Sequence, residues 1–157
     1  MADARFQDGD DGPLRLIAQA PADIPVLSAL VQDAVFPASE IRYDRKAHRF
    51  AILLNRFRWE DEPAARAAGR PFERVRSLLV MEGVLRARSQ GIDPRDKDTV
   101  LSLLSVSFAE GAEGSGTLTL TLAGDGAIAL EVEALDLHLD DVTRPYIAPS
   151  GKAPQHD

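Results

Sequence analysis

The sequence predicts an α+β domain: a curled antiparallel sheet, or partly open β-barrel, of about seven strands with one N-terminal amphipathic helix. Three observations lead to this prediction. A single apolar stripe at helical spacing occurs early, strand-like alternation fills most of the remaining chain, and the expected strands are joined by connections of hairpin length, which favour antiparallel pairing. The 157 residues are 45% hydrophobic and 27% charged, enough for one domain with its own core.

One globular domain is expected over residues 13–147, between flexible tails at residues 1–12 and 148–157. The first tail contains a run of Asp and Gly, and the second is rich in Pro, Ser and Gly. Both segments are too polar to pack into a core.

The helix is expected to start within residues 22–25, after a short strand over residues 14–19. Asp23 can cap it, and Pro25 falls in the first turn, where a missing backbone N–H costs nothing. The helix should end before Pro37, because proline disfavours helical backbone in the preceding residue. The apolar residues that form its stripe are Val26, Leu27, Leu30, Val31 and Ala34.

Strand patterns dominate the middle of the chain. Residues 44–48 are typical of a hairpin turn, and residues 60–71 of a loop with one helical turn at residues 64–68. The longest strand pattern contains Gly83 on its apolar side, where a glycine marks a bulge or a bend. The expected strands are Ser39–Tyr43, Arg49–Trp59 and Phe72–Ser89.

The second half continues with a turn at residues 90–94 and an apolar strand over Val100–Phe108. A β-hairpin with one solvent-exposed and one buried face is predicted next. Thr and Leu alternate over residues 117–122, a Gly-Asp-Gly turn follows, and residues 128–132 form the second strand. The apolar parity then changes within residues 133–142. A bulged strand and a helix both explain that change, and we favour the bulged strand.

The net charge of −7 is distributed unevenly. Residues 1–39 carry −4, residues 40–97 carry +5, and residues 98–157 carry −8. The acidic balance argues against a general nucleic-acid binder. The basic middle is the main electrostatic feature of the chain, and its cations are mostly arginines, which bind carboxylates and phosphates better than lysines do.

Six of these arginines occur in pairs two residues apart, and residues with that spacing on a strand point to one face. If the strands are neighbours, the six guanidinium groups share a face suited to an anionic ligand or an acidic partner. The alternative is a solvated outer face with its own ion pairs. The pairs are Arg56 and Arg58, Arg74 and Arg76, and Arg86 and Arg88.

Two further side chains belong to this candidate site. Asn55 precedes the first pair, and Trp59, the only tryptophan, follows it. A tryptophan there can stack on a base or anchor a partner, although a lone tryptophan is more often part of a core.

Nothing in the sequence indicates catalysis, a metal or a cofactor. The chain has no cysteine, and its three histidines show no metal-binding spacing. The glycine-rich segment at residues 111–116 lacks the lysine and the following helix of a phosphate-binding loop. We therefore expect no catalytic residue, no metal ligand and no cofactor.

Several stretches together resemble a known family. The chain is similar, over roughly residues 14–146, to an uncharacterised alpha-proteobacterial family called domain of unknown function 2948. The resemblance implies a small, soluble, cytoplasmic bacterial protein and brings no assigned activity or ligand. The stretches are Leu16–Ala18, Leu30–Val35, Arg49–Glu60, Glu73–Ser77 and Arg88–Asp93, followed by Asp98 and Val100–Leu104.

The sequence thus favours a non-catalytic binding or interaction module that holds a small anionic ligand or an acidic protein through the arginine face. Binding of RNA or single-stranded DNA by the same face, and a barrel that encloses a small ligand, are the alternatives. No apolar run reaches the length of a membrane span, and the acidic N-terminus is unlike a signal peptide. We expect a cytoplasmic protein without membrane contact, and the sequence leaves its oligomeric state open.

Overall fold

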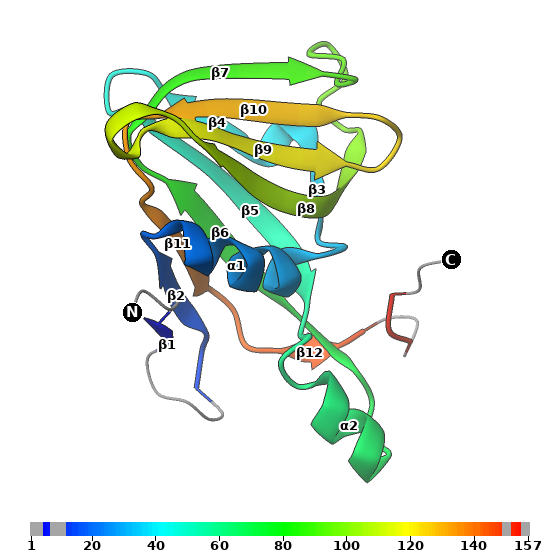
Figure 1. Cartoon of the computed structure of the whole chain (residues 1–157). Coiled ribbons are helices and arrows are strands. Elements are labelled where there is room, and N and C mark those ends of the chain that lie inside the picture. Colours follow the sequence, from blue (N-terminus) through cyan, green and yellow to red (C-terminus); the bar gives the residue numbers. More distant parts are fainter. Residues whose placement is uncertain (1–4, 7–11, 149–151, 155–157) are drawn as a thin grey trace.

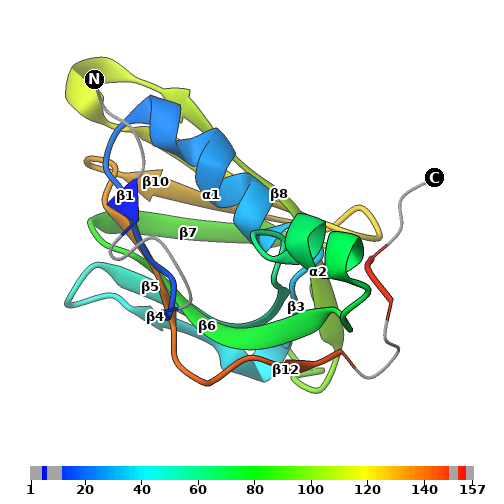
Figure 2. The ribbon, with the colours of Figure 1, turned by 90° about the horizontal axis from the view of Figure 1, so that it is seen from below.

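The computed structural model describes residues 5–6, 12–148 and 152–154 (Figure 1). Twelve strands form one large antiparallel sheet. Its main path runs β1-β2-β11-β6-β5-β3-β8-β9-β10-β7, with β12 added to β6 and β4 added to β5. The longest helix, α1, packs on one face of this sheet, and α2 lies at the end where β5 and β6 meet (Figures 1 and 2).

The bounds of the elements are as follows. The helices are α1 (Ile24–Val31) and α2 (Glu62–Ala68), with short 3₁₀ helices at Pro21–Asp23, Ala38–Glu40 and Ala112–Gly114. The strands are β1 (Arg5–Phe6), β2 (Arg15–Ala18), β3 (Val35–Pro37), β4 (Ile41–Asp44), β5 (Arg49–Phe57), β6 (Glu73–Met81), β7 (Val84–Gln90), β8 (Val100–Glu110), β9 (Gly116–Leu122), β10 (Ala127–Val132), β11 (Leu137–Asp141) and β12 (Tyr146–Ile147).

The predicted α+β class is confirmed, but the curled sheet or barrel is wrong. The sheet is neither closed nor strongly curled, and it has more strands than the seven expected. The difference arises at Gly83, whose φ of 70° turns the chain out of β6. Beyond that bend, β7 pairs with β10 and not with the neighbours of β6. The strand pattern over residues 72–89 is therefore two strands, and the predicted bend at Gly83 is confirmed.

A second interruption of the strand pattern, within residues 133–136, lies opposite the bend at Gly83. β10 pairs with β7 before this break and β11 pairs with β6 after it, so the helical alternative for residues 133–142 is wrong. Backbone hydrogen bonds join the two breaks, since the amide of Glu82 donates to Asp136 O and that of Glu133 donates to Gly83 O. The two chain segments thus form one bent ribbon that links the halves of the sheet.

Helix α1 begins within the predicted residues 22–25 and covers the core face of the sheet. It ends at Val31, so Ala34 of the predicted stripe lies beyond it, and Val26 of that stripe is 37% exposed. Its residues Ile24, Leu27, Leu30 and Val31 are buried against apolar side chains from β2, β5, β6, β8 and β11. Asp23, however, does not cap this helix. Its Oδ2 accepts hydrogen bonds from the amides of Gln19 (3.1 Å) and Ala20 (3.0 Å), so it closes the preceding turn.

Three other local predictions have different outcomes. The Thr-Leu hairpin is confirmed as β9 and β10. In β8 a register shift between Leu103 and Ser105 reverses the side-chain alternation, so Leu103 and Val106 are both buried. The loop over residues 60–71 contains a seven-residue helix, α2, and not a single turn.

The predicted tails are only partly described. Arg5 and Phe6 pair with Ile17 and Leu16 of β2, so this part of the first tail belongs to the sheet. Ala148, the first residue of the second tail, is buried. Residues 1–4, 7–11, 149–151 and 155–157 lie outside the described residues, and the prediction of flexible tails stays a prediction there.

Gly116 provides a test of the close pairing between β8 and β9. A Cβ at this position would contact the carbonyl of Ala109 and come within 2.6 Å of the Phe108 ring. We expect Gly116→Ala to lower the free energy of unfolding by about 1–3 kcal/mol through overpacking, measured by urea denaturation. Gly12→Ala is the control, because nothing lies within 4 Å of its added Cβ. Equal stability of the two variants would contradict the packing described.

Candidate anion-binding site

The strand register separates the first two arginine pairs. Across β5 and β6, Arg56 lies opposite Val75, whereas Phe57 lies opposite Arg74 and Asn55 opposite Arg76. Residues directly opposite each other in an antiparallel pair share a face. Arg56 is therefore on the core face, and Arg74 and Arg76 are on the other face together with Asn55.

The third pair is in the other half of the sheet. Arg86 and Arg88 lie on β7 opposite Glu131 and Ala129 of β10, and both are exposed. Figure 1 shows β7 at the far side of the molecule from the lower ends of β5 and β6. The six arginines thus do not form one face, and the layout that the sequence predicted is wrong.

Arg56 is fully buried and sits at the centre of an ion-pair cluster. Its Nη1 and Nη2 donate to the two carboxylate oxygens of Glu60 at 2.8 and 2.7 Å. Its Nη2 also donates to Asp141 Oδ1 at 3.0 Å, and its Nε donates to Ser77 Oγ at 2.9 Å. Ser77 Oγ in turn donates to Asp141 Oδ1 at 2.6 Å, and the amide of Leu14 donates to Asp141 Oδ2 at 2.9 Å.

The electrostatics of this cluster favour the charged forms. Burial alone would lower the pKa of Arg56, but the hydrogen bonds and charges of Glu60 and Asp141 outweigh it and raise that pKa above its ordinary value. Burial likewise opposes ionisation of Glu60, yet its hydrogen bonds with Arg56 and the charge of Arg56 lower the pKa of Glu60. Arg56 is thus already occupied by carboxylates of its own chain.

Arg58 and Trp59 are also held by their own chain. The Arg58 side chain is 14% exposed and forms ion pairs with Glu73, Glu60 and Asp61. The Trp59 ring packs edge-on against Phe57 with ring centroids 4.6 Å apart. Its indole N–H donates to Gln32 O at 2.8 Å. Trp59 is half-buried, so neither a free stacking platform nor a fully buried core position describes it.

Arg74, unlike Arg56 and Arg58, forms no direct ion pair with a carboxylate of the described residues. It is half-buried, and its Nε donates to Asn55 Oδ1 at 2.6 Å while its Nη2 donates to the backbone oxygens of Asn55 (3.1 Å) and Asp33 (3.4 Å). Among the described residues, no carboxylate lies within 4.0 Å of its guanidinium. Burial lowers the pKa of Arg74, and the charges of Tyr146 and Asp33 offset this only in part. Amide oxygens therefore orient this cation without neutralising it.

Tyr146 and Arg76 complete the surroundings of Arg74. Tyr146 of β12 is paired directly with Arg74 of β6. Its hydroxyl oxygen accepts a hydrogen bond from the Asn55 side-chain amide. Arg76 is exposed two residues along β6 on the same face, and Arg144 is exposed in the segment before β12. We call Asn55, Arg74, Arg76 and Tyr146 the Arg74 cluster.

Comparison with known families identifies the chain. The model of a family described as a protein of unknown function, DUF2948, matches residues 14–156. The chain belongs to the DUF2948 family. No curated protein and no solved structure matches this DUF2948 domain. Within the part of the chain that the structure describes, no helix is long and apolar enough to cross a membrane.

Sequence reasoning missed Asp141 and Tyr146 of this DUF2948 domain and also the burial of Arg56, whereas it had named Glu60 as an ion-pair partner of the arginines. The burial of Arg56 had a signal, because Arg56 shares the parity of the apolar Ile52 and Leu54 on β5. Asp141 likewise shares the parity of Leu137 and Leu139, which indicates its core-facing position. Tyr146 had no comparable signal, since it lies outside a recognisable periodic pattern.

The Arg56 cluster predicts a large loss of stability on substitution. Arg56→Met leaves Glu60 and Asp141 without their counter-charge, and breaking a buried ion pair costs about 3–5 kcal/mol. Urea denaturation at pH 7 measures the difference. Arg76→Met, on an exposed side chain of the neighbouring strand, should change the stability by less than about 0.5 kcal/mol. Losses of similar size in the two variants would contradict the structural role of Arg56.

The lowered pKa of Glu60 predicts a pH dependence. Because the folded-state pKa lies below the unfolded value of about 4.3, Glu60 stabilises the fold above that pH, and this contribution disappears as the pH falls through the folded pKa. Glu60→Gln keeps a hydrogen-bond acceptor but cannot titrate. The loss of stability between pH 6 and pH 3 should therefore be smaller in this variant than in the wild type. Parallel stability curves for the two proteins would exclude a contribution from Glu60.

Proposed function

We propose that this DUF2948 domain is a non-catalytic binding module that captures an anionic group at the Arg74 cluster. The anionic group belongs to a small ligand or to an acidic protein partner. The observation that carries the proposal is the half-buried guanidinium of Arg74, which is oriented by Asn55 and forms no direct ion pair with a carboxylate of the described residues, while the charge of Asp33 offsets its burial only in part.

The contrast with the other arginines supports this choice. Arg56, Arg58 and Arg74 are the buried or half-buried arginines of the described residues. Glu60 and Asp141 neutralise Arg56, and Glu73 pairs with Arg58. A desolvated cation without such a partner is costly to maintain, and an incoming carboxylate or phosphate would remove that cost with charge-assisted hydrogen bonds.

The surroundings of Arg74 extend the proposed site. Arg76 adds a second guanidinium on the same face of β6, two residues from Arg74. The hydroxyl oxygen of Tyr146 accepts a hydrogen bond from the Asn55 side-chain amide, and a tyrosine O–H can also donate to a ligand oxygen. This arrangement offers hydrogen-bond donors of two kinds, guanidinium and hydroxyl, to an anion.

The other functions that the sequence left open have less support. An open sheet does not enclose a ligand as a barrel would, and the dispersal of the six arginines removes the continuous basic strip that a nucleic-acid strand would follow. The proposal keeps the bacterial, cytoplasmic setting that the sequence predicts. In that setting, free metabolite anions and acidic proteins are both available as ligands.

Substitution of Arg74 tests the proposal. We expect inorganic phosphate, citrate or a capped hexaglutamate peptide to shift the side-chain amide resonances of Asn55, which wild type and variant share, in a saturable way in NMR titrations at low ionic strength. Arg74→Gln removes the charge and should weaken the tightest of these interactions at least tenfold, or about 1.4 kcal/mol. The three probes separate a phosphate site from a carboxylate or acidic-protein site.

Arg88→Gln is the matched control, because Arg88 is an exposed strand arginine in the other half of the sheet. Its affinity for each probe should stay within twofold of the wild type. Equal weakening by Arg74→Gln and Arg88→Gln, or the absence of saturable shifts with all three probes, would overturn the proposed function.

A further inference from the structure

The face of β5 and β6 that carries the Arg74 cluster is apolar at its centre. Leu78 and Val80 of β6 share this face, and Leu53 of β5 lies directly opposite Leu78. Ile17 of β2 continues the surface through His138, its partner on β11, which is also the partner of Val80. The four apolar side chains are half-buried, and none is packed against the hydrophobic core. We call Ile17, Leu53, Leu78 and Val80 the outer apolar face.

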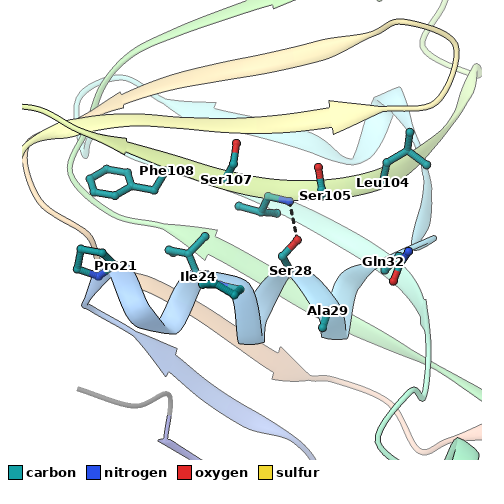
Figure 3. Close-up of a pocket in the computed structure, with 11 residues that line it drawn as sticks. Pro21, Ile24, Ser28, Ala29, Gln32, Leu104, Ser105, Ser107 and Phe108 are labelled. Carbon is teal, nitrogen blue, oxygen red and sulfur yellow. Dashed lines mark hydrogen bonds between the residues drawn. The ribbon is translucent and has the colours of Figure 1, made fainter. Parts of the chain in front are cut away.

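Helix α1 lies on the other side of this half of the sheet. Its buried residues pack on the core face, and Ser28 Oγ accepts a hydrogen bond of 2.9 Å from the Val106 amide, which fastens the helix to β8 (Figure 3). Figure 2 shows α1 and β7, β8 and β10 on the same side of β6. The outer face of an antiparallel sheet is commonly polar. A contiguous apolar surface there is typical of an interaction site.

Charged residues lie on β6 at equal distances from the centre of the outer apolar face. Arg74 is four residues before Leu78 and Glu82 is four residues after it, and residues with even spacing on a strand share a face. Glu82 continues the register of β6, since its amide donates to Asp136 O and its carboxylate accepts from Arg49 Nε at 3.0 Å. Its side chain is 31% exposed. One end of the face thus has the carboxylates of Glu82 and Asp136 beside one guanidinium, whereas the Arg74 cluster at the other end has two guanidinium groups and no carboxylate.

We propose that the outer apolar face binds a second copy of this chain, and that Glu82 of the partner subunit gives Arg74 a direct carboxylate partner. The inference rests on the proposed function, because it names the acidic protein that the Arg74 cluster captures. A two-fold axis that lies between the copies and crosses β6 at right angles at Leu78 reverses one strand over the other. This axis places Leu78 on the partner's Leu78 and Arg74 on the partner's Glu82.

The dimensions of such a pair agree with known sheet packing. Facing sheets lie about 10 Å apart, a distance that an arginine and a glutamate side chain span together. Their strands cross at about 30°, so Asp136 beside Glu82 broadens the acidic end that Arg74 meets. A carboxylate has about four lone-pair sites, and Glu82 can therefore keep Arg49 while it accepts from the partner's Arg74.

The equal spacing of the two charges favours a second copy over an unrelated acidic protein. Because the axis passes through Leu78, the same pair of residues closes both ends of the interface, and apolar side chains meet between them. The chain also has the acidic character that a partner of the Arg74 cluster needs, since its net charge is −7. A two-fold axis parallel to β6 would place Arg74 on the partner's Arg74, and like charges in contact exclude that arrangement.

Sedimentation velocity of the full chain at low ionic strength tests the proposal. We expect the wild type to form a dimer with a dissociation constant below about 100 μM. Arg74→Glu and Glu82→Arg should each weaken the dimer at least tenfold, because each substitution opposes like charges at both ends. An equimolar mixture of the two variants should dimerise as the wild type does, since the introduced glutamate then faces the introduced arginine. Arg88→Glu, on an exposed strand arginine in the other half of the sheet, is the matched control and should dimerise within twofold of the wild type.

Leu78→Arg tests the centre of the interface without touching the Arg74 cluster. It should be monomeric, because two introduced guanidinium groups would meet at the axis. Val26→Arg is its control, since Val26 is a 37% exposed apolar residue on the opposite side of the sheet, and this variant should dimerise like the wild type.

Three results would overturn the second copy as partner. They are a monomeric wild type, a mixture of Arg74→Glu and Glu82→Arg that does not recover, and a Leu78→Arg variant that dimerises like the wild type. Saturable anion binding by a monomeric wild type would overturn the dimer alone and leave the proposed function in place. Absence of both the dimer and saturable binding would overturn both proposals.

Discussion

The fold of this DUF2948 domain depends on the burial of one guanidinium. Arg56 lies on the core face of a central strand, where a cation without counter-charges would be prohibitively costly. Glu60 comes from the loop after β5, Ser77 from β6 and Asp141 from β11, and all three meet at this one side chain. Asp141 also binds the amide of Leu14 and so connects the start of β2 to the same cluster. The network therefore ties four separate parts of the chain to one another.

The same network decides which arginine is available to a ligand. Strand alternation places consecutive arginines of a pair on one face, but antiparallel register places the β5 and β6 pairs on opposite faces. Glu60 and Asp141 neutralise Arg56 on the core face, where burial makes neutralisation necessary. On the opposite face Arg74 is held by amide and carbonyl oxygens, which orient a guanidinium without cancelling its charge. Arg56 is fully buried and Arg74 is half-buried, so burial alone does not separate the structural arginine from the one proposed to bind a ligand. Their hydrogen-bond and ion-pair partners do.

Local patterns predicted those features of the fold that local physics determines. The α1 stripe, the alternation of Thr and Leu in β9 and the bend at Gly83 each depend on a few neighbouring residues. The strand order was not predictable in this way, because the pairing of β2 with β11 joins segments more than a hundred residues apart. The shared arginine face failed for a related reason. The spacing within a pair bears only on one strand, whereas the faces that two strands share depend on their register, which no single segment specifies.

The connection between Leu14 and Asp141 has a consequence for biosynthesis. These two residues are 127 positions apart, and the strands that carry them pair in the same half of the sheet. While the chain leaves the ribosome, β5 is complete long before Asp141 has been made, so the nascent chain holds Arg56 without one of its two carboxylates. Contacts between such distant segments also form slowly. The domain therefore completes its fold only after nearly the whole chain has been synthesised.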